Sequence, residues 1–121
     1  MTFDWTHGAL ADGLRLYRAG KFFDAHEAWE IVWLTAPQPE KTFLQGLIQV
    51  TVAFHHLQRN NPLGTQRLLK GALRKLEAYP PDFGGFDVTL LCTDIRDHLH
   101  SLDSDPLASH LPPARINLLW L

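Results

Sequence analysis

An imidazole and two carboxylates lie close together in the chain, at His26, Glu27 and Glu30. The surrounding segment, residues 20–33, reads Gly-Lys-Phe-Phe-Asp-Ala-His-Glu-Ala-Trp-Glu-Ile-Val-Trp. Side chains four residues apart share one face of a helix, whereas adjacent side chains are turned by about 100°. We therefore expect His26 and Glu30 to act together on the inward edge of a helix, with Glu27 turned toward solvent.

A second set of polar side chains follows at Gln45, Gln49 and His56. In a helix, these three and Val52 fall within a stripe about 60° wide. A buried amide or imidazole without a partner costs about 1–3 kcal/mol, so another element must face this stripe. We expect the polar edge of the preceding helix to do so, which would give one polar cluster that spans two helices.

Three kinds of chemistry fit this cluster. His26, Glu30 and His56 could hold a divalent Zn, Mn or Fe ion in a hydrolytic site, with Gln45 and Gln49 orienting the ligands. However, His-Glu-x-x-Glu lacks the second histidine of the His-Glu-x-x-His zinc motif. The same side chains could instead form a hydrogen-bonded network that fixes helix register. They could also line a small-molecule pocket, with Trp29 or Trp33 as one wall. The spacing leaves these alternatives open, and no reaction follows from it.

Helices must position all of these side chains. The periodicity of the apolar residues and the proline, glycine and capping signals predict helices over residues 6–19, 21–35, 39–59 and 62–79, and a fifth that begins after the N-cap Asp87. Apolar residues point in almost every direction around the 39–59 helix, so we expect it to be central and buried. The proline-led residues 111–121 should lie extended over the bundle. The predicted fold is all-α, a single-domain bundle of about five helices over residues 1–121.

Length, charge and cysteine content narrow the class of protein. A chain of 121 residues is long enough for one domain with its own core. Its net charge of −2 gives no global case for binding nucleic acid or an anionic membrane. No apolar run approaches the roughly 20 residues of a membrane span, and no signal peptide is recognisable. With a single cysteine, Cys92, expected in the core, we expect a cytoplasmic protein.

Two smaller charged patterns are typical of helix surfaces. Arg67, Lys70 and Arg74 share one face of the 62–79 helix, as on an ordinary solvated side. His98 follows Asp94 by four residues, and we expect a surface His–Asp pair there.

Motifs in the first two-thirds of the chain resemble the DUF309 family of small helical bacterial and archaeal proteins. The matching residues are Gly20 with Phe23; Ala25, His26, Glu27, Glu30 and Trp33; the run Leu44-Gln45-Gly46-Leu47-Ile48-Gln49; Ala53, His56, Asn61, Gly64, Leu68 and Leu69. The resemblance covers residues 10–79. It implies a helical bundle and no catalytic assignment. The chain differs from the family pattern at Asn60 and Thr65, where glycine and alanine are usual, which affects the turn before the 62–79 helix.

An interaction module is the alternative from a different class. Residues 10–33 and 43–76 each resemble a degenerate tetratricopeptide hairpin, although two copies are fewer than the three that stacking normally requires. If the chain is an interaction module, its partner is a protein. If the polar cluster lines a pocket, its partner is a small molecule. Trp5 and Trp120 add aromatic surface that a homodimer could use.

Overall fold

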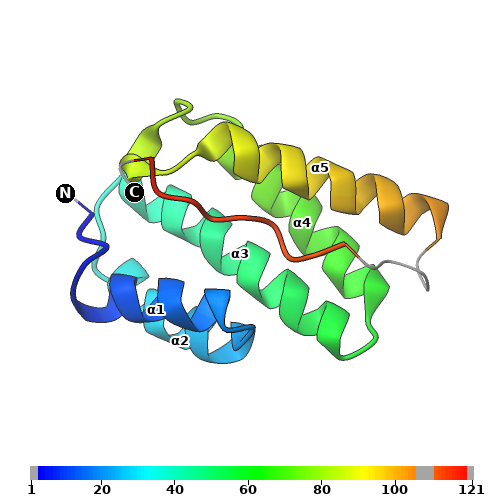
Figure 1. Cartoon of the computed structure of the whole chain (residues 1–121). Helices are drawn as coiled ribbons and strands as arrows, with labels where there is room; N and C mark the ends of the chain where they lie inside the picture. Colours follow the sequence, from blue (N-terminus) through cyan, green and yellow to red (C-terminus); the bar gives the residue numbers. More distant parts are fainter. Residues whose placement is uncertain (1–2, 106–110, 120–121) are drawn as a thin grey trace.

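The computed structural model describes residues 3–105 and 111–119. Within these ranges the chain is all-α and contains no strands, as predicted (Figure 1). The helices are α1 (Gly8–Arg18), α2 (Phe22–Trp33), α3 (Glu40–Gln58), α4 (Pro62–Leu76) and α5 (Val88–Ser104), with a short 3-10 helix, η1 (Phe83–Gly85), before α5. None of the described helices is long and apolar enough to cross a membrane.

α1 and α2 form a tight hairpin. The amides of Gly20 and Lys21 donate to the carbonyls of Tyr17 and Leu16, which closes the end of α1. The buried indole of Trp29, on α2, donates a 3.0 Å hydrogen bond to the Leu10 carbonyl on α1. Gly13 makes this contact possible, because a Cβ atom at that position would lie only 2.2 Å from Trp29 Nε1.

α3 is the central helix, as the distribution of its apolar residues predicted. Both α2 and α4 pack against it. Its fully buried apolar side chains are Phe43, Leu44, Leu47, Val50, Ala53 and Phe54. These side chains span about half of the circumference of the helix, and every other residue from Glu40 to Leu57 is at least partly buried, so α3 forms the core around which the two hairpins, α1–α2 and α4–α5, are arranged.

The turn into α4 accommodates both departures from the family pattern. Asn60 adopts a positive φ of 58°, a conformation that asparagine tolerates better than most residues. Asn61 caps α4 by accepting a 3.0 Å hydrogen bond from the Gly64 amide. The buried hydroxyl of Thr65 lies within hydrogen-bonding distance of the Ala53 carbonyl on α3, at 3.0 Å, so the larger side chain ties α4 to α3.

α4 ends at Leu76, three residues earlier than expected. Tyr79 leaves the helix, and its hydroxyl donates a 2.6 Å hydrogen bond to the Pro39 carbonyl just before α3. Its ring packs against Phe43 and Phe83. A tertiary contact at the far end of α3 thus ends α4 before the prolines of residues 80–81.

The described part of the C-terminal segment, residues 111–119, is extended and lies over α3 between α1 and α5 (Figure 1). Its side chains alternate: Ala114, Ile116 and Leu118 are buried, and the residues between them are exposed. Leu118 forms an isolated antiparallel bridge with Phe86. This period of two is the pattern of an extended chain with one face on the core, so residues 111–119 close the bundle.

Trp5 does not supply exposed aromatic surface for a homodimer. It is 6% exposed, packs against Phe86 and Trp29, and donates a 2.9 Å hydrogen bond from Nε1 to the Gly84 carbonyl. The expectation was wrong at this residue because the segment before α1 folds back onto the core. Trp120 lies outside the described residues.

Candidate functional site

The polar edge of α2 contains the contact predicted from the spacing of its residues. His26 Nε2 lies 2.9 Å from Glu30 Oε2, and the side chains are 23% and 47% exposed. Because a carboxylate only accepts, Nε2 must carry the ring proton, and Nδ1 of the neutral ring is then an acceptor. Glu27 is exposed, as expected. The pair therefore presents His26 Nδ1 away from Glu30.

Trp33 lies at the C-terminal end of the same helix, beside the start of α3. The ammonium of Lys41 lies 4.4 Å from the centre of the indole ring and donates a 3.0 Å hydrogen bond to the Trp33 carbonyl. This cation–π contact and hydrogen bond fix the end of α2 against α3. The indole Nε1 of Trp33 is buried and has no hydrogen-bond partner among the described residues.

The polar stripe of α3 faces α4, whereas we expected it to face α2. The Gln49 amide lies against Gly71 of α4, where a Cβ atom would be 3.4 Å from Gln49 Nε2. His56 Nδ1 lies 3.3 Å from Asn61 Nδ2 in the turn before α4. Gln45 is half-buried one turn before Gln49. The angle of a stripe around a helix does not specify which neighbour it meets, so the sequence could not settle this point.

We refer to His26, Glu30, Trp33, Gln45, Gln49 and His56 as the polar set. The structure brings together His26 with Glu30, and His56 with Asn61. Among the described residues, no hydrogen bond joins the members on α2 to those on α3. The members of the polar set on α2 and those on α3 are thus not joined directly to each other.

Unpaired buried atoms are concentrated in the polar set. In the part of the chain that the structure describes, four side-chain nitrogen or oxygen atoms are buried without a hydrogen-bond partner. Three of them are His26 Nδ1, Trp33 Nε1 and Gln49 Oε1, and the fourth is His98 Nδ1. Buried polar atoms in folded proteins are nearly always paired, with protein or with water. Three buried atoms of the polar set are therefore still able to form hydrogen bonds, because no other described residue pairs with them.

The described structure does not show the three-ligand metal site that was one of the alternatives for His26, Glu30 and His56. Within residues 3–105 and 111–119, no group of three or more His, Cys, Asp or Glu side chains is arranged to hold a metal ion. Only His26 and Glu30 are in contact, because His56 lies beside Asn61 at the start of α4.

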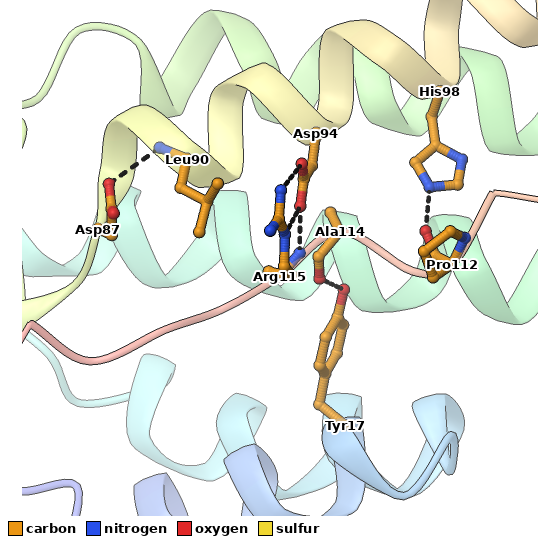
Figure 2. Close-up of polar contacts among 8 residues, drawn as sticks. All are labelled: Tyr17, Asp87, Leu90, Asp94, His98, Pro112, Ala114 and Arg115. Carbon is orange, nitrogen blue, oxygen red and sulfur yellow. Dashed lines mark hydrogen bonds and ion pairs between the residues drawn. The ribbon is translucent and has the colours of Figure 1, made fainter. Parts of the chain in front are cut away.

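A second polar constellation, which the sequence did not indicate, lies where residues 111–119 meet α1 and α5 (Figure 2). Arg115 forms a two-pronged ion pair with Asp94, with Nε–Oδ2 and Nη2–Oδ1 distances of 2.9 and 3.0 Å. The Arg115 side-chain hydrogen bond is the main cause of a lowered pKa for Asp94. The Tyr17 hydroxyl donates to the Ala114 carbonyl at 2.5 Å, and burial raises the pKa of Tyr17. These contacts join the segment to both hairpins.

His98 corrects the expectation of a surface His–Asp pair. It is 1% exposed, and its Nε2 lies 2.6 Å from the Pro112 carbonyl (Figure 2). Its ring packs on Phe54, and burial is the main cause of its lowered pKa. Asp94, the predicted partner, binds Arg115 instead. No local spacing could reveal this arrangement, because the partners of both side chains come from the distant residues 111–119.

The buried thiol of Cys92 is part of the core, as expected. Burial is the main cause of the raised pKa of this thiol, so Cys92 lacks the stabilised thiolate of a reactive cysteine.

Comparisons with known proteins agree with the motif-based resemblance. The family model described as "Domain of unknown function (DUF309)" matches residues 10–68. A relative described as "Uncharacterized protein YpuF", from Bacillus subtilis (strain 168), is 36% identical over 58 residues, which are 47% of this chain and 33% of the relative. An "Uncharacterized protein" from Aquifex aeolicus (strain VF5) is 27% identical over 110 residues, which are 90% of this chain and 32% of the relative. The chain therefore spans about a third of the length of each of these relatives. Neither the family description nor the relatives assign a reaction. Residues 10–68 of this chain match the DUF309 family model, in agreement with the resemblance of the motifs.

Proposed function

We propose that the polar set is a binding site for a small polar molecule. The observation that carries this proposal is the unpaired state of His26 Nδ1, Trp33 Nε1 and Gln49 Oε1, which are all buried. Each such atom costs about 1–3 kcal/mol when it has no partner. A molecule that pairs with one or more of these atoms would recover part of this energy on binding.

The types of these atoms indicate the chemistry of the ligand. The indole N–H of Trp33 is a donor only, so it requires an acceptor. Gln49 Oε1 accepts, and so does His26 Nδ1 while Glu30 holds the proton of the ring on Nε2. The ligand we propose therefore carries at least one acceptor and at least one N–H or O–H donor, as small amides and hydroxyl compounds do.

The alternative of a purely structural network has less support. Such a network would stabilise the protein through hydrogen bonds between the members on different helices. In the described residues, His26 pairs within α2 and His56 pairs with the turn before α4. In a purely structural network, three buried atoms without hydrogen-bond partners would lower the stability of the protein by more than the existing contacts raise it. A ligand site, in contrast, requires unpaired atoms with which the ligand can bond.

Native mass spectrometry of the protein, purified without denaturation, tests the proposal. We expect the wild-type chain to retain a small molecule at about one copy per chain. We expect Trp33→Phe and Gln49→Met to weaken its retention, because each removes one of the unpaired atoms and leaves an apolar side chain in its place. Gln66→Met is the matched control, since Gln66 bonds to Asp103 on α5 and lies outside the polar set.

Stability measurements on the same variants separate the two alternatives. In ligand-free protein, Gln49→Met should leave the free energy of unfolding equal or higher, because it removes an unpaired buried atom. The proposal is wrong if the wild type retains no molecule, and both variants lose about 1 kcal/mol or more of stability. That outcome would identify the polar set as a structural network.

A further inference from the structure

The outer side of α2 combines exposed apolar side chains with carboxylates. Phe23 and Leu34 are 51% and 61% exposed, and Ile31 beside them is 65% exposed. Phe23, Glu27, Glu30 and Leu34 follow the spacing i, i+4, i+7, i+11, so they lie in one row along the helix. Leu34 extends the row because it keeps helical dihedrals (φ −56°, ψ −33°) as the C-cap. α2 contains no lysine or arginine, so this α2 row is apolar at both ends and acidic in the middle.

α4 has a row with the same spacing and the opposite charge. Leu63, Arg67, Lys70 and Arg74 again follow i, i+4, i+7, i+11, and all four are exposed. The side chain of Leu63 is 54% exposed. No aspartate or glutamate occurs within α4. This α4 row therefore carries basic side chains at the positions where the α2 row has its carboxylates.

The charged side chains of the two rows have no ion-pair partner on another helix among the described residues. α2 and α4 each pack on α3 with their buried faces. The α4 row lies on the side of α4 away from α3, and the α2 row lies on the flank of α2, where the Phe23 ring packs on the rings of His26 and of His55 on α3. Among the described residues, no ion pair engages Glu27, Arg67, Lys70 or Arg74, and Glu30 contacts only His26 on its own helix. Exposed apolar residues gathered beside charged residues on one helix face are typical of interaction surfaces.

We infer that these rows join two copies of this chain, with the α2 row of one copy against the α4 row of the other. The central positions of both rows are i+4 and i+7. Whether the helices run parallel or antiparallel, Glu27 and Glu30 therefore lie opposite Arg67 and Lys70. The antiparallel arrangement also places Leu34 against Leu63 and Phe23 against the guanidinium of Arg74, an apolar contact and a cation–π contact. Each copy carries both rows, so the contact can be reciprocated in a twofold dimer or repeated head to tail.

Charge reversal provides a test in which two separately disabled variants should restore each other. The first variant is Glu27→Lys with Glu30→Lys, and the second is Arg67→Glu with Lys70→Glu. In the first, both rows are basic, and in the second, both are acidic. Each variant alone should repel itself. Mixed together, the basic α2 row faces an acidic α4 row and the basic α4 row faces an acidic α2 row, so association should return.

Sedimentation velocity over a concentration series measures the outcome, and circular dichroism checks that each variant is folded. We expect the wild type to self-associate at low salt, and association to weaken between about 0.05 and 0.5 M NaCl. Each reversal should weaken association by roughly tenfold or more, and the equimolar mixture should recover it. Asp82→Lys with Asp97→Lys reverses two exposed carboxylates outside both rows and should associate like the wild type.

Three results would overturn the inference. They are a wild type that is monomeric at every concentration in low salt, reversal variants that associate as the wild type does, and a mixture that stays monomeric. Phe23→Ser with Leu34→Ser provides a second route, because it leaves every charge in place. Association that is unchanged in this variant would exclude the α2 row as the contact.

Discussion

At the scale of single residues, the two tryptophans of α2 illustrate how the same side chain serves different purposes. Trp29 is fully buried, and its Nε1 donates to the Leu10 carbonyl at 3.0 Å. Trp33 is half-buried, and its Nε1 is enclosed without a partner among the described residues. A buried N–H that is bonded stabilises the fold, whereas one that is not bonded costs free energy until something pairs with it. We therefore assign Trp29 to the fold and Trp33 to the proposed site.

This distinction predicts different costs for the same substitution. Trp29→Phe leaves the Leu10 carbonyl without its donor and opens space in a fully buried position. Trp33→Phe removes an unpaired N–H and part of a half-buried ring that the Lys41 ammonium contacts, but it leaves no hydrogen-bond acceptor without its donor. We expect Trp29→Phe to lower the free energy of unfolding by at least about 1 kcal/mol more than Trp33→Phe, as measured by urea denaturation of ligand-free protein. Equal losses would mean that Trp33 Nε1 has a structural partner.

At the scale of the elements, the buried glycines Gly13 and Gly71 leave different amounts of room between their helices and the neighbouring side chains. Gly13 of α1 lies against the Trp29 ring, where a Cβ atom would be 2.2 Å from Nε1 and 2.3 Å from Cδ1. Gly71 of α4 lies against the Gln49 amide, where a Cβ atom would be at 3.4 Å, an ordinary contact with the end of a flexible side chain. The two helix pairs therefore differ in how much additional volume they can accept.

Alanine at these two positions should have unequal effects. Gly13→Ala pushes the Trp29 ring out of its contact with α1, so we expect a loss of about 1–3 kcal/mol or more. Gly71→Ala should stay within about 1 kcal/mol of the wild type, since better helix propensity offsets the tighter contact. Thermal or chemical denaturation of both variants measures the difference. A stable Gly13→Ala variant would show that α1 and α2 can separate without cost.

At the scale of the whole molecule, residues 111–119 join the two hairpins. Tyr17 and Arg18 of α1 donate to the Ala114 and Ile116 carbonyls, and Asp94 and His98 of α5 bind the same segment from the other side. Side chains of this segment also fill the space over α3. Contacts between residues so far apart in sequence mean that the bundle is completed only when this segment is in place.

The His98 contact should make stability depend on pH. Burial lowers the pKa of His98 below its ordinary value of 6.5, so the unfolded chain binds a proton more readily than the folded one. The neutral ring donates from Nε2 to Pro112, and protonation of the buried Nδ1 would add a donor without an acceptor. Asp94 and Asp97 on α5 oppose the shift, but burial is the larger cause. The stability contributed by neutral His98 is therefore present above about pH 6.5 and is lost as pH falls below it.

Urea denaturation at several pH values between 7 and 5 checks this expectation. The wild type should become less stable as pH falls through this window, and His98→Gln should lose less stability over the same range because it cannot titrate. Loss of the Asp94–Arg115 ion pair requires a lower pH, because hydrogen bonding from Arg115 lowers the Asp94 pKa. A variant with the same pH dependence as the wild type would exclude His98 as the cause.

The local signals of the sequence determined which segments are helices and where most of them begin. Asp87 caps α5, Asn61 and Pro62 start α4, and Gly20 separates α1 from α2, because caps and turns depend on neighbouring residues. The same spacing placed His26 beside Glu30, and it predicted a central α3 and an extended segment at residues 111–119. Each of these features follows from backbone geometry and from the period of the apolar residues, both of which are local properties.

Only the tertiary structure decided which surfaces meet. Helix periodicity gives the angle of Gln49 around α3, but the identity of the neighbouring helix depends on how the hairpins pack, and it is α4. His98 and Trp5 are buried because residues 111–119 and the segment before α1 cover them, and the partner of Asp94 is 21 positions away. Such long-range contacts leave no periodic trace in the sequence, because they join segments whose spacing along the chain is arbitrary.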